Sequence, residues 1–306
     1  MGTDVIFFTS LEPEQQNILD KAENVIHEFE NNFSRFIENN ELDNFNNSKV
    51  KKLKVSKTMA DLLNISKKYF LKTKGTYDPT IITSLERIGY DKNFADINFK
   101  EPGETKSIDV NKIRQEFIIR PKMIDLKIEG KSISRPEGFR VDFGGIGKGY
   151  IVDFISQEIF YDVENYWISA GGDILASGNQ DKGIGFDIGV QNPAKPDDVI
   201  FYINTKGEKL GIATSGIIER GGVINNFKWH HIIDPRSGLP AVNDILSVTV
   251  ISANAIKADI YAKTVLILGE KEGLNFIENE IDSACIIFVK NKETIFSKRV
   301  ALYLKK

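Results

Sequence analysis

Apolar residues near the start of the chain recur every three or four positions, the spacing of one face of an α-helix. The stripe predicts a long helix running to about residue 32, with Pro13 in its first turn, and a short strand, Val5–Phe8, before it. His27 falls outside the stripe, so we expect a solvated side chain there. The stripe consists of Ile18, Ala22, Val25, Phe29, Phe33 and Phe36.

The next segments alternate between polar stretches and short periodic elements. Residues 31–47 are rich in asparagine and predict a loop, whereas residues 49–57 predict a strand with one solvated lysine face. A second helix is predicted from Thr58 to about Lys72, with Asp61 as the capping-box partner of Thr58. Residues 94–136 have the composition of strands and turns.

The second half of the chain mixes helices and strands. Helices are predicted after the glycines at 144–149, over Ala255–Leu268 and over Glu272–Ile277. No sustained βαβ alternation is present, so we predict an α+β fold, with mixed sheets and flanking helices, rather than a doubly wound sheet. The predicted strands are Tyr166–Ile168, Phe186–Val190, Val199–Ile203, Leu210–Thr214, Ile245–Ile251, Ala284–Val289 and Arg299–Leu304.

Composition and charge exclude several classes of protein. Among 306 residues, 40 Lys and Arg face 43 Asp and Glu, which lacks the basic excess of a nucleic-acid binder. The longest apolar run, Ala284–Val289, is far shorter than a membrane span. The single cysteine, Cys285, excludes an intrachain disulfide and is expected to be a buried core residue. No signal peptide is recognisable, which favours a cytoplasmic protein, the alternative being an extracytoplasmic protein anchored through a removed leader.

The densest glycine cluster, residues 141–149, predicts a strand, a turn and then a helix. It matches neither a Walker A loop nor a GxGxxG fingerprint. Glycines let backbone N–H groups approach a ligand, and a helix N-terminus favours phosphate, with Lys148 adding a cation. The segment therefore indicates either a phosphate site or a tight turn without a ligand.

Two further segments carry candidate chemistry. His231 stands just before a sharp turn at residues 234–238 and is a candidate general base, although the turn by itself explains its neighbours. Asp259 and Lys263 are four apart on a predicted helix, so they share one face. They form either an ordinary ion pair or, through Asp259, part of a Mg²⁺ site.

Taken together and in order, these segments resemble the FAD:protein FMN transferases, the ApbE flavin transferases. The likeness covers nearly the whole chain and implies a single FMN-transferase domain over residues 1–306, with an ApbE-like, T-fold-related architecture. The matching segments are MGT at 1–3, FSRF at 33–36 with EL at 41–42, GTYDPT at 75–80, VDFGGIGKGY at 141–150, AGGDI at 170–174, ATSG at 213–216 with ER at 219–220, and HIIDPRSG at 231–238.

The resemblance also implies roles for individual residues. His231 corresponds to the catalytic histidine, and Gly145 and Asp259 correspond to positions that bind a metal, Mg²⁺. Lys263 departs from the family, because many members have a threonine metal ligand there; either the metal binds more weakly or the lysine supplies charge in its place. The positions that match FAD contacts are Met1, Phe36, Thr76, Tyr77, Asp78, Asp142, Lys148, Ile232 and Ile233.

The implied reaction moves FMN from FAD onto a Thr or Ser hydroxyl of an acceptor protein and releases AMP. Two other functions stay open at this point. One is an FAD pyrophosphatase that gives FMN and AMP, and the other is a protein that binds FAD without catalysis.

Overall fold

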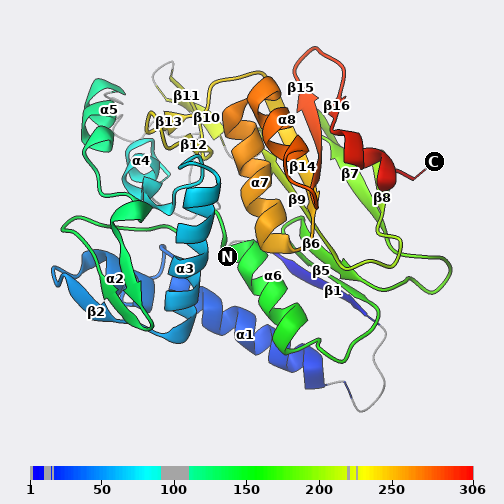
Figure 1. The fold of residues 1–306 in the computed structure, drawn as a ribbon, viewed down its shortest axis with the longest axis horizontal. Coiled ribbons are helices and arrows are strands. Elements are labelled where there is room, and N and C mark those ends of the chain that lie inside the picture. Colours follow the sequence, from blue (N-terminus) through cyan, green and yellow to red (C-terminus); the bar gives the residue numbers. More distant parts are fainter. Residues whose placement is uncertain are drawn as a thin grey trace.

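A seven-stranded antiparallel sheet forms the centre of the computed structural model, which describes residues 3–9, 15, 17–90, 110–218, 221–224 and 227–305 (Figure 1). Its strands run in the order β1-β5-β6-β9-β14-β15-β16, so strands distant in sequence become neighbours. They are β1 (Val5–Thr9), β5 (Tyr166–Ala170), β6 (Asp173–Ser177), β9 (Leu210–Gly216), β14 (Ile245–Ser252), β15 (Ala284–Val289) and β16 (Ile295–Phe296).

The central strands of the sheet are buried on both faces. In β15, Cys285 and Ile287 join a large hydrophobic cluster with helices α6 (Gly147–Glu158) and α7 (Ala255–Leu268), beside which lies α8 (Glu270–Glu278). The alternate residues Ala284, Ile286 and Phe288 join a second cluster with the hairpin of β7 (Asp187–Asn192) and β8 (Lys195–Asn204). Strands covered on both sides read as continuous apolar runs, as β15 does. Cys285 is fully buried, as predicted.

Helix α7 is buried around most of its circumference and is fixed at its start by two neighbours. Asn254 caps it by accepting a hydrogen bond from the Lys257 N–H. Asp153 of α6 accepts hydrogen bonds from the N–H groups of Ala255 and Ile256, at 2.8 and 2.9 Å. A carboxylate at a helix N-terminus satisfies donors that have no intrahelical partner.

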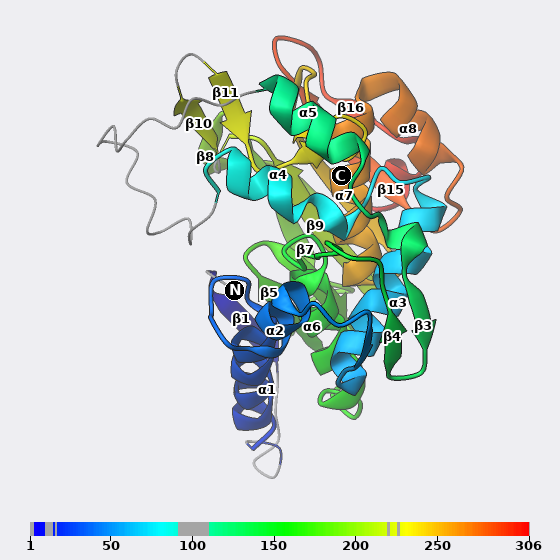
Figure 2. The same cartoon turned by 90° about the vertical axis from the view of Figure 1, so that its left-hand side faces the viewer.

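The remaining elements lie to the left of this core in Figure 1, with α1 below it, and Figure 2 shows them from that side. The hydrophobic cluster on the α6 and α7 side of the sheet continues into them through residues such as Leu62, Met123 and Phe139. They are the helices α1 (Asn17–Phe33), α2 (Glu41–Asn47), α3 (Lys57–Lys72), α4 (Ile82–Arg87) and α5 (Val110–Ile118), the 3-10 turns η2 (Pro79–Ile81) and η4 (Met123–Asp125), a small sheet of β2 (Lys52–Lys54), β4 (Ser132–Ser134) and β3 (Lys127–Glu129), and the pairs β10 (Gly221–Ile224) with β11 (Phe227–His230) and β12 (Ile233–Asp234) with β13 (Leu239–Pro240).

The α+β prediction is confirmed, and the helix over Ala255–Leu268 and the strand over Ala284–Val289 have the predicted bounds. The N-terminal stripe forms α1, whose buried side chains include Ala22, Phe29 and Phe33.

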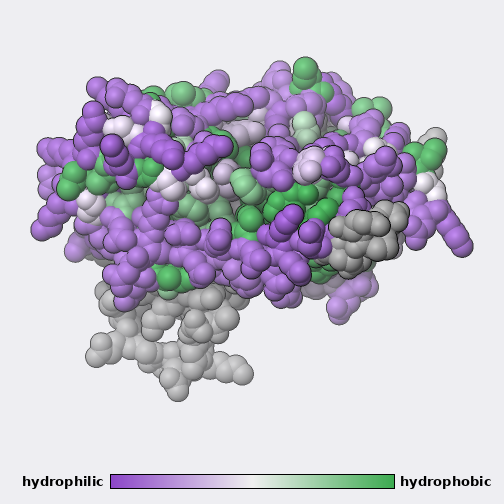
Figure 3. All heavy atoms as spheres, turned by 90° about the horizontal axis from the view of Figure 1, so that it is seen from below, coloured by the Kyte–Doolittle hydropathy of each residue, from purple (hydrophilic) through white to green (hydrophobic). Residues whose placement is uncertain are grey.

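Seen from below, the surface is mostly hydrophilic around a hydrophobic area near its middle (Figure 3). No helix in the described part of the chain has the length and apolar character needed to cross a membrane.

Several predicted elements were wrong. The segment 31–47 contains helix α2, which Asn40 caps by accepting from the Asp43 N–H. Helix α3 begins at Lys57, and its cap is Ser56, which bonds the Met59 N–H, so the Thr58–Asp61 capping box does not form. Tertiary packing also makes a helix of 110–118, whereas 94–109 and Pro13 lie outside the described residues.

The chain end also differs from the prediction. In place of a strand over 299–304, residues Lys298–Leu302 form the 3-10 turn η5, and only Leu304 pairs with a strand residue, Ile203. The strand β6 was not predicted, because it is short and follows the glycine pair Gly171 and Gly172 directly.

We predict that Gly149→Ala destabilises the fold by about 1–3 kcal/mol, because an added methyl group would overpack a tight contact. A Cβ at Gly149 would lie 2.7 Å from the Ile256 Cα, which is backbone and cannot move aside cheaply. Gly147→Ala in the same helix is the control, since its Cβ would meet only the Phe29 ring, at 3.4 Å. Thermal unfolding of both variants checks the prediction, which fails if they lose equal stability.

Candidate active site

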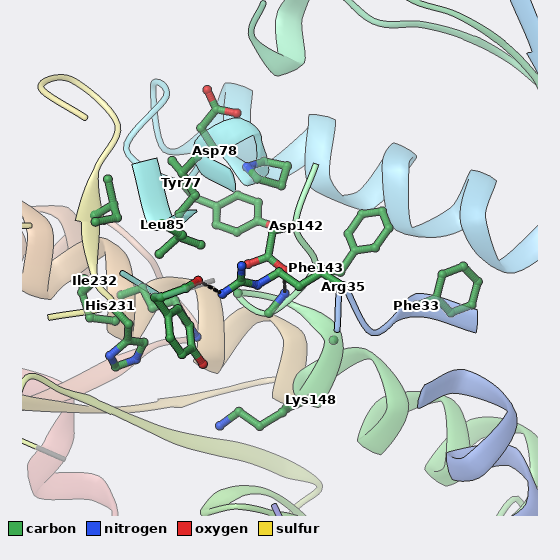
Figure 4. A pocket seen from close by; sticks show the side chains of 18 of the residues that line it. Phe33, Arg35, Tyr77, Asp78, Leu85, Asp142, Phe143, Lys148, His231 and Ile232 are labelled. Carbon is green, nitrogen blue, oxygen red and sulfur yellow. Dashed lines mark hydrogen bonds and ion pairs between the residues drawn. The ribbon is translucent and has the colours of Figure 1, made fainter. Parts of the chain in front are cut away.

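A pocket lies where the glycine loop, α7 and the segment around His231 meet (Figure 4). Of the predicted site residues, all but two line it. Asp259 is buried just behind its wall through a contact with the lining residue Lys263, and Met1 lies outside the described residues. The predicted residues that line the pocket are Phe36, Thr76, Tyr77, Asp78, Asp142, Gly145, Lys148, His231, Ile232 and Ile233.

The turn after α3 carries Thr76, Tyr77 and Asp78 into the pocket wall. It is shaped by left-handed backbone at Lys74 and Gly75, with φ of 52° and 80°. The Asp78 carboxylate accepts from the N–H and hydroxyl of Thr80 and from Arg120 at 2.9 Å, and it points away from Lys148 and His231 (Figure 4). Burial raises the Asp78 pKa, which Arg120 opposes. The carboxylate therefore holds the turn in shape.

The glycine loop leads directly into α6. The Asp142 N–H donates to the Pro79 carbonyl at 2.8 Å, and the Asp142 carboxylate accepts from the Gly144 N–H at 3.1 Å. The Tyr77 ring packs on Gly145, where an added Cβ would lie 3.4 Å from it. No side chain caps α6 at Ile146, although the Gly147 N–H already donates to the Phe143 carbonyl at 2.7 Å. The positive end of the helix still favours an anionic ligand.

Two acid–lysine pairs lie where α6, β6 and α7 meet. The Lys148 ammonium contacts the Asp173 carboxylate, and the Lys263 ammonium contacts Asp259. Both acids are 1% exposed, and both oxygens of Asp173 and Oδ2 of Asp259 are buried without a hydrogen-bond partner. Burial, and then the charge of Asp259, raise the pKa of Asp173 to about 6, while Lys148 and Lys263 lower it.

An arginine occupies the aromatic side of the pocket. The Arg35 guanidinium lies 4.3 Å from the centre of the Phe36 ring and 4.6 Å from that of Tyr90, and it donates to the Tyr90 carbonyl at 2.5 Å. Its Nε is 3.8 Å from the Asp142 carboxylate. Figure 4 shows Arg35 reaching across the middle of the pocket. Cation–π contacts of this kind fix a charged group against planar rings.

The two adjacent histidines have different surroundings. His230 Nδ1 accepts from the Ile232 N–H at 3.3 Å, and Nε2 donates to the Ala241 carbonyl at 2.9 Å, the tautomer that satisfies both bonds. Burial lowers the pKa of His230, so the ring is neutral. His231 instead lines the pocket, with its ring centre 6.3 Å from that of Tyr90. The structure therefore brings His231, not His230, to the candidate site.

Sequence reasoning assigned no role to three residues of this site. Arg35 and Asp173 lie inside segments that the resemblance had marked, FSRF and AGGDI, so a signal was present. Tyr90 follows α4 in no recognisable motif, and its place depends on packing against Arg35 and Phe36.

Comparison with known proteins identifies the family of the chain. The model of the ApbE family matches residues 1–287. The chain is 33% identical over 162 residues to an FAD:protein FMN transferase of Klebsiella pneumoniae (strain 342), an alignment covering 52% of this chain and about half, 49%, of that relative. It is 28% identical over 286 residues to an FAD:protein FMN transferase of Buchnera aphidicola subsp. Schizaphis graminum, covering 91% and 81%.

The fold is similar to two solved structures, each at 23% sequence identity. One is an ApbE protein of Thermotoga maritima, with a TM-score of 0.84 and coverage of 100% of this chain and 97% of that one. The other is the flavin transferase ApbE of Vibrio cholerae, with a TM-score of 0.82 and coverage of 99% and 96%. With the family model matching nearly its whole length, the chain belongs to the ApbE family.

Proposed function

We propose that this protein is an FAD:protein FMN transferase, which moves FMN from FAD onto a Thr or Ser hydroxyl of an acceptor protein. The observation that carries the proposal is a single pocket that joins His231, the glycine loop with Lys148, and an aromatic wall, in a chain of this family. We also propose that residues 1–306 form one domain, since one hydrophobic cluster spans the sheet and the elements beside it.

The reaction balances as a phosphoryl-group displacement. The acceptor oxygen forms a bond to the FMN phosphorus, the pyrophosphate P–O bond breaks, and AMP leaves with the bonding electron pair. The hydroxyl proton passes to His231, the candidate general base. Lys148 and the positive N-terminal end of α6 stabilise charge on the phosphate oxygens.

The remaining pocket residues would bind FAD. Tyr77 and Phe36 offer ring faces, and the Ile232–Ile233 backbone, Thr76 and Asp142 surround them. Because the carboxylate of Asp78 is bonded to Thr80 and Arg120, we propose that its contribution to FAD binding is the shape of its turn. For Met1 we propose a contact with FAD, as the family resemblance implies.

One incubation separates the transferase from the two alternatives. AMP released from FAD only when an acceptor protein is present, together with an FMN mass shift on that acceptor, supports the transferase. AMP released without an acceptor supports a pyrophosphatase, and binding of FAD without AMP release supports a non-catalytic protein.

We predict that His231→Ala lowers the rate of acceptor-dependent AMP release by about 10²–10⁴-fold, the usual contribution of a positioned general base, while FAD stays bound. His230→Ala is the matched control. It removes two backbone hydrogen bonds and lowers stability, but below its unfolding temperature it should keep the transfer rate. Equal loss of rate in both variants would contradict the assignment.

We predict that Lys148→Ala weakens FAD binding and removes most of the preference for FAD over FMN. The lysine lies at the uncapped start of α6, where a pyrophosphate gains a charge-assisted hydrogen bond. Calorimetric titration with FAD and FMN measures both affinities. Equal affinity of the unaltered protein for the two flavins would argue against a pyrophosphate site.

Asp259, just behind the pocket wall, offers part of a Mg²⁺ site. Asp259 has one buried oxygen without a hydrogen-bond partner, and hard cations prefer such oxygens, but the Lys263 ammonium contacts the other oxygen of the same carboxylate. We propose that Mg²⁺ binds weakly, through Asp259 and Gly145, with substrate phosphates completing its shell. When bound, the metal would stabilise negative charge on the phosphate oxygens.

We predict that Lys263→Thr tightens Mg²⁺ binding, because it removes a cation and adds an oxygen ligand. The measurement is the rise in unfolding temperature with Mg²⁺ in the presence of FAD, beside a Mg²⁺ titration of AMP release. If the unaltered protein is fully active in EDTA and Lys263→Ala is inactive, the lysine replaces the metal and the prediction is wrong.

A further inference from the structure

Asp173 is a buried acid that the proposed reaction has not yet used. It begins β6 directly after the turn of Gly171 and Gly172, whose φ angles are 56° and 86°. Positive φ at both central residues is the geometry of a tight hairpin turn, and it pairs Ala170 with Asp173 across the hairpin. The backbone thus fixes where the Asp173 carboxylate lies.

The contacts of Asp173 lead to Lys148. Both carboxylate oxygens are buried without a hydrogen-bond partner, and one of them, Oδ2, contacts the Lys148 ammonium as an ion pair. Lys148 lines the pocket, whereas Asp173 does not and is 1% exposed. Asp173 therefore lies behind the lysine and can act on a ligand only through it.

A carboxylate in this position is not explained by stability. Burying a charge costs several kcal/mol, and a buried ion pair is often no more stable than apolar side chains of the same volume. Unsatisfied buried polar atoms in a native structure call for an explanation, of which a catalytic role is one. Here the partner of the acid is a cation that faces the pocket.

We propose that Asp173 is a positioning residue, which holds the Lys148 ammonium where negative charge develops as AMP leaves. This inference rests on the proposed function of the pocket. A lysine has a flexible four-carbon stem, and without a tether its ammonium follows the charge of the bound pyrophosphate. A cation fixed in advance stabilises the transition state without reorganisation.

The tether has opposite effects on binding and on rate. The Asp173 charge competes with the pyrophosphate for the Lys148 ammonium, so it weakens ground-state binding of FAD. It also fixes the cation for the transition state, and misplacing a group by about 1 Å can cost a factor of 10² in rate. Only interactions that are stronger in the transition state than in the ground state raise kcat.

The test is Asp173→Asn, which removes the charge and keeps the shape. We expect kcat for acceptor-dependent AMP release to fall about 10–100-fold. We expect FAD binding, followed by quenching of flavin fluorescence at low salt, to tighten about two- to fivefold, the effect of one partly screened charge. A merely structural defect would weaken FAD binding together with kcat, and that result would overturn the proposal.

Two further variants sharpen the test. In a Lys148→Met background, Asp173→Asn should change neither FAD affinity nor kcat, because the tethered group is gone. If Asp173→Asn changes them by the same factor with and without Lys148, the two residues act independently and the proposal is wrong. Asp153→Asn is the matched control, a buried acid of α6 that bonds only to backbone N–H groups of α7 in the described contacts. Asp153→Asn should lower the stability of the fold, but it should not tighten FAD binding while kcat falls.

Failure of this inference is distinct from failure of the proposed function. The change in FAD affinity and its dependence on Lys148 are measured without any transfer, so they test the tether even if no acceptor is ever modified. Transfer by the unaltered protein, with kcat and FAD affinity unchanged in Asp173→Asn, would overturn the tether alone.

Discussion

The close contact between α6 and α7 is the constraint on which the site depends. Gly149 lets the backbone of α6 approach Ile256, and Asp153 reaches across to bond the first N–H groups of α7. A side chain at Gly149 would push one helix away from the other, and loss of the Asp153 carboxylate would weaken the hydrogen bonds at the start of α7. Since Lys148 lies on α6 and Lys263 on α7, the contact that packs the core also sets the spacing of the charges in the pocket.

The same packing explains why the two buried acids need their lysines. Asp173 and Asp259 are both 1% exposed, so each charge has lost nearly all of its hydration and depends on its ammonium partner. Each of two neighbouring carboxylates also makes ionisation of the other less favourable. For this reason Asp259 contributes to the raised pKa of Asp173. The two lysines therefore stabilise the folded protein, apart from any part that they take in a reaction.

Sequence reasoning found what is encoded locally and missed what is encoded by packing. The glycine loop, the helix over 255–268 and the place of His231 in the pocket follow from short motifs and periodicity. Helix α2 and the Ser56 cap were missed, because polar residues at helix starts look like loop residues until tertiary contacts select the helix. The Lys148–Asp173 pair joins residues 25 positions apart through sheet topology, which no local pattern reveals.

Pairing of charges also decides how the pocket can attract FAD. In the described part of the chain, Arg35 faces Asp142, Lys148 contacts Asp173, and Lys263 contacts Asp259. Each lysine and arginine that lines the pocket thus has an acidic partner. A net positive potential would therefore not attract a pyrophosphate. Attraction must come from donors aimed at fixed points, namely the uncapped start of α6 and tethered ammonium groups. Arg35 covers one face of the Phe36 ring, so a stacked flavin or adenine ring would take the other face. The ring and the phosphates of FAD would then each meet a surface that is already formed.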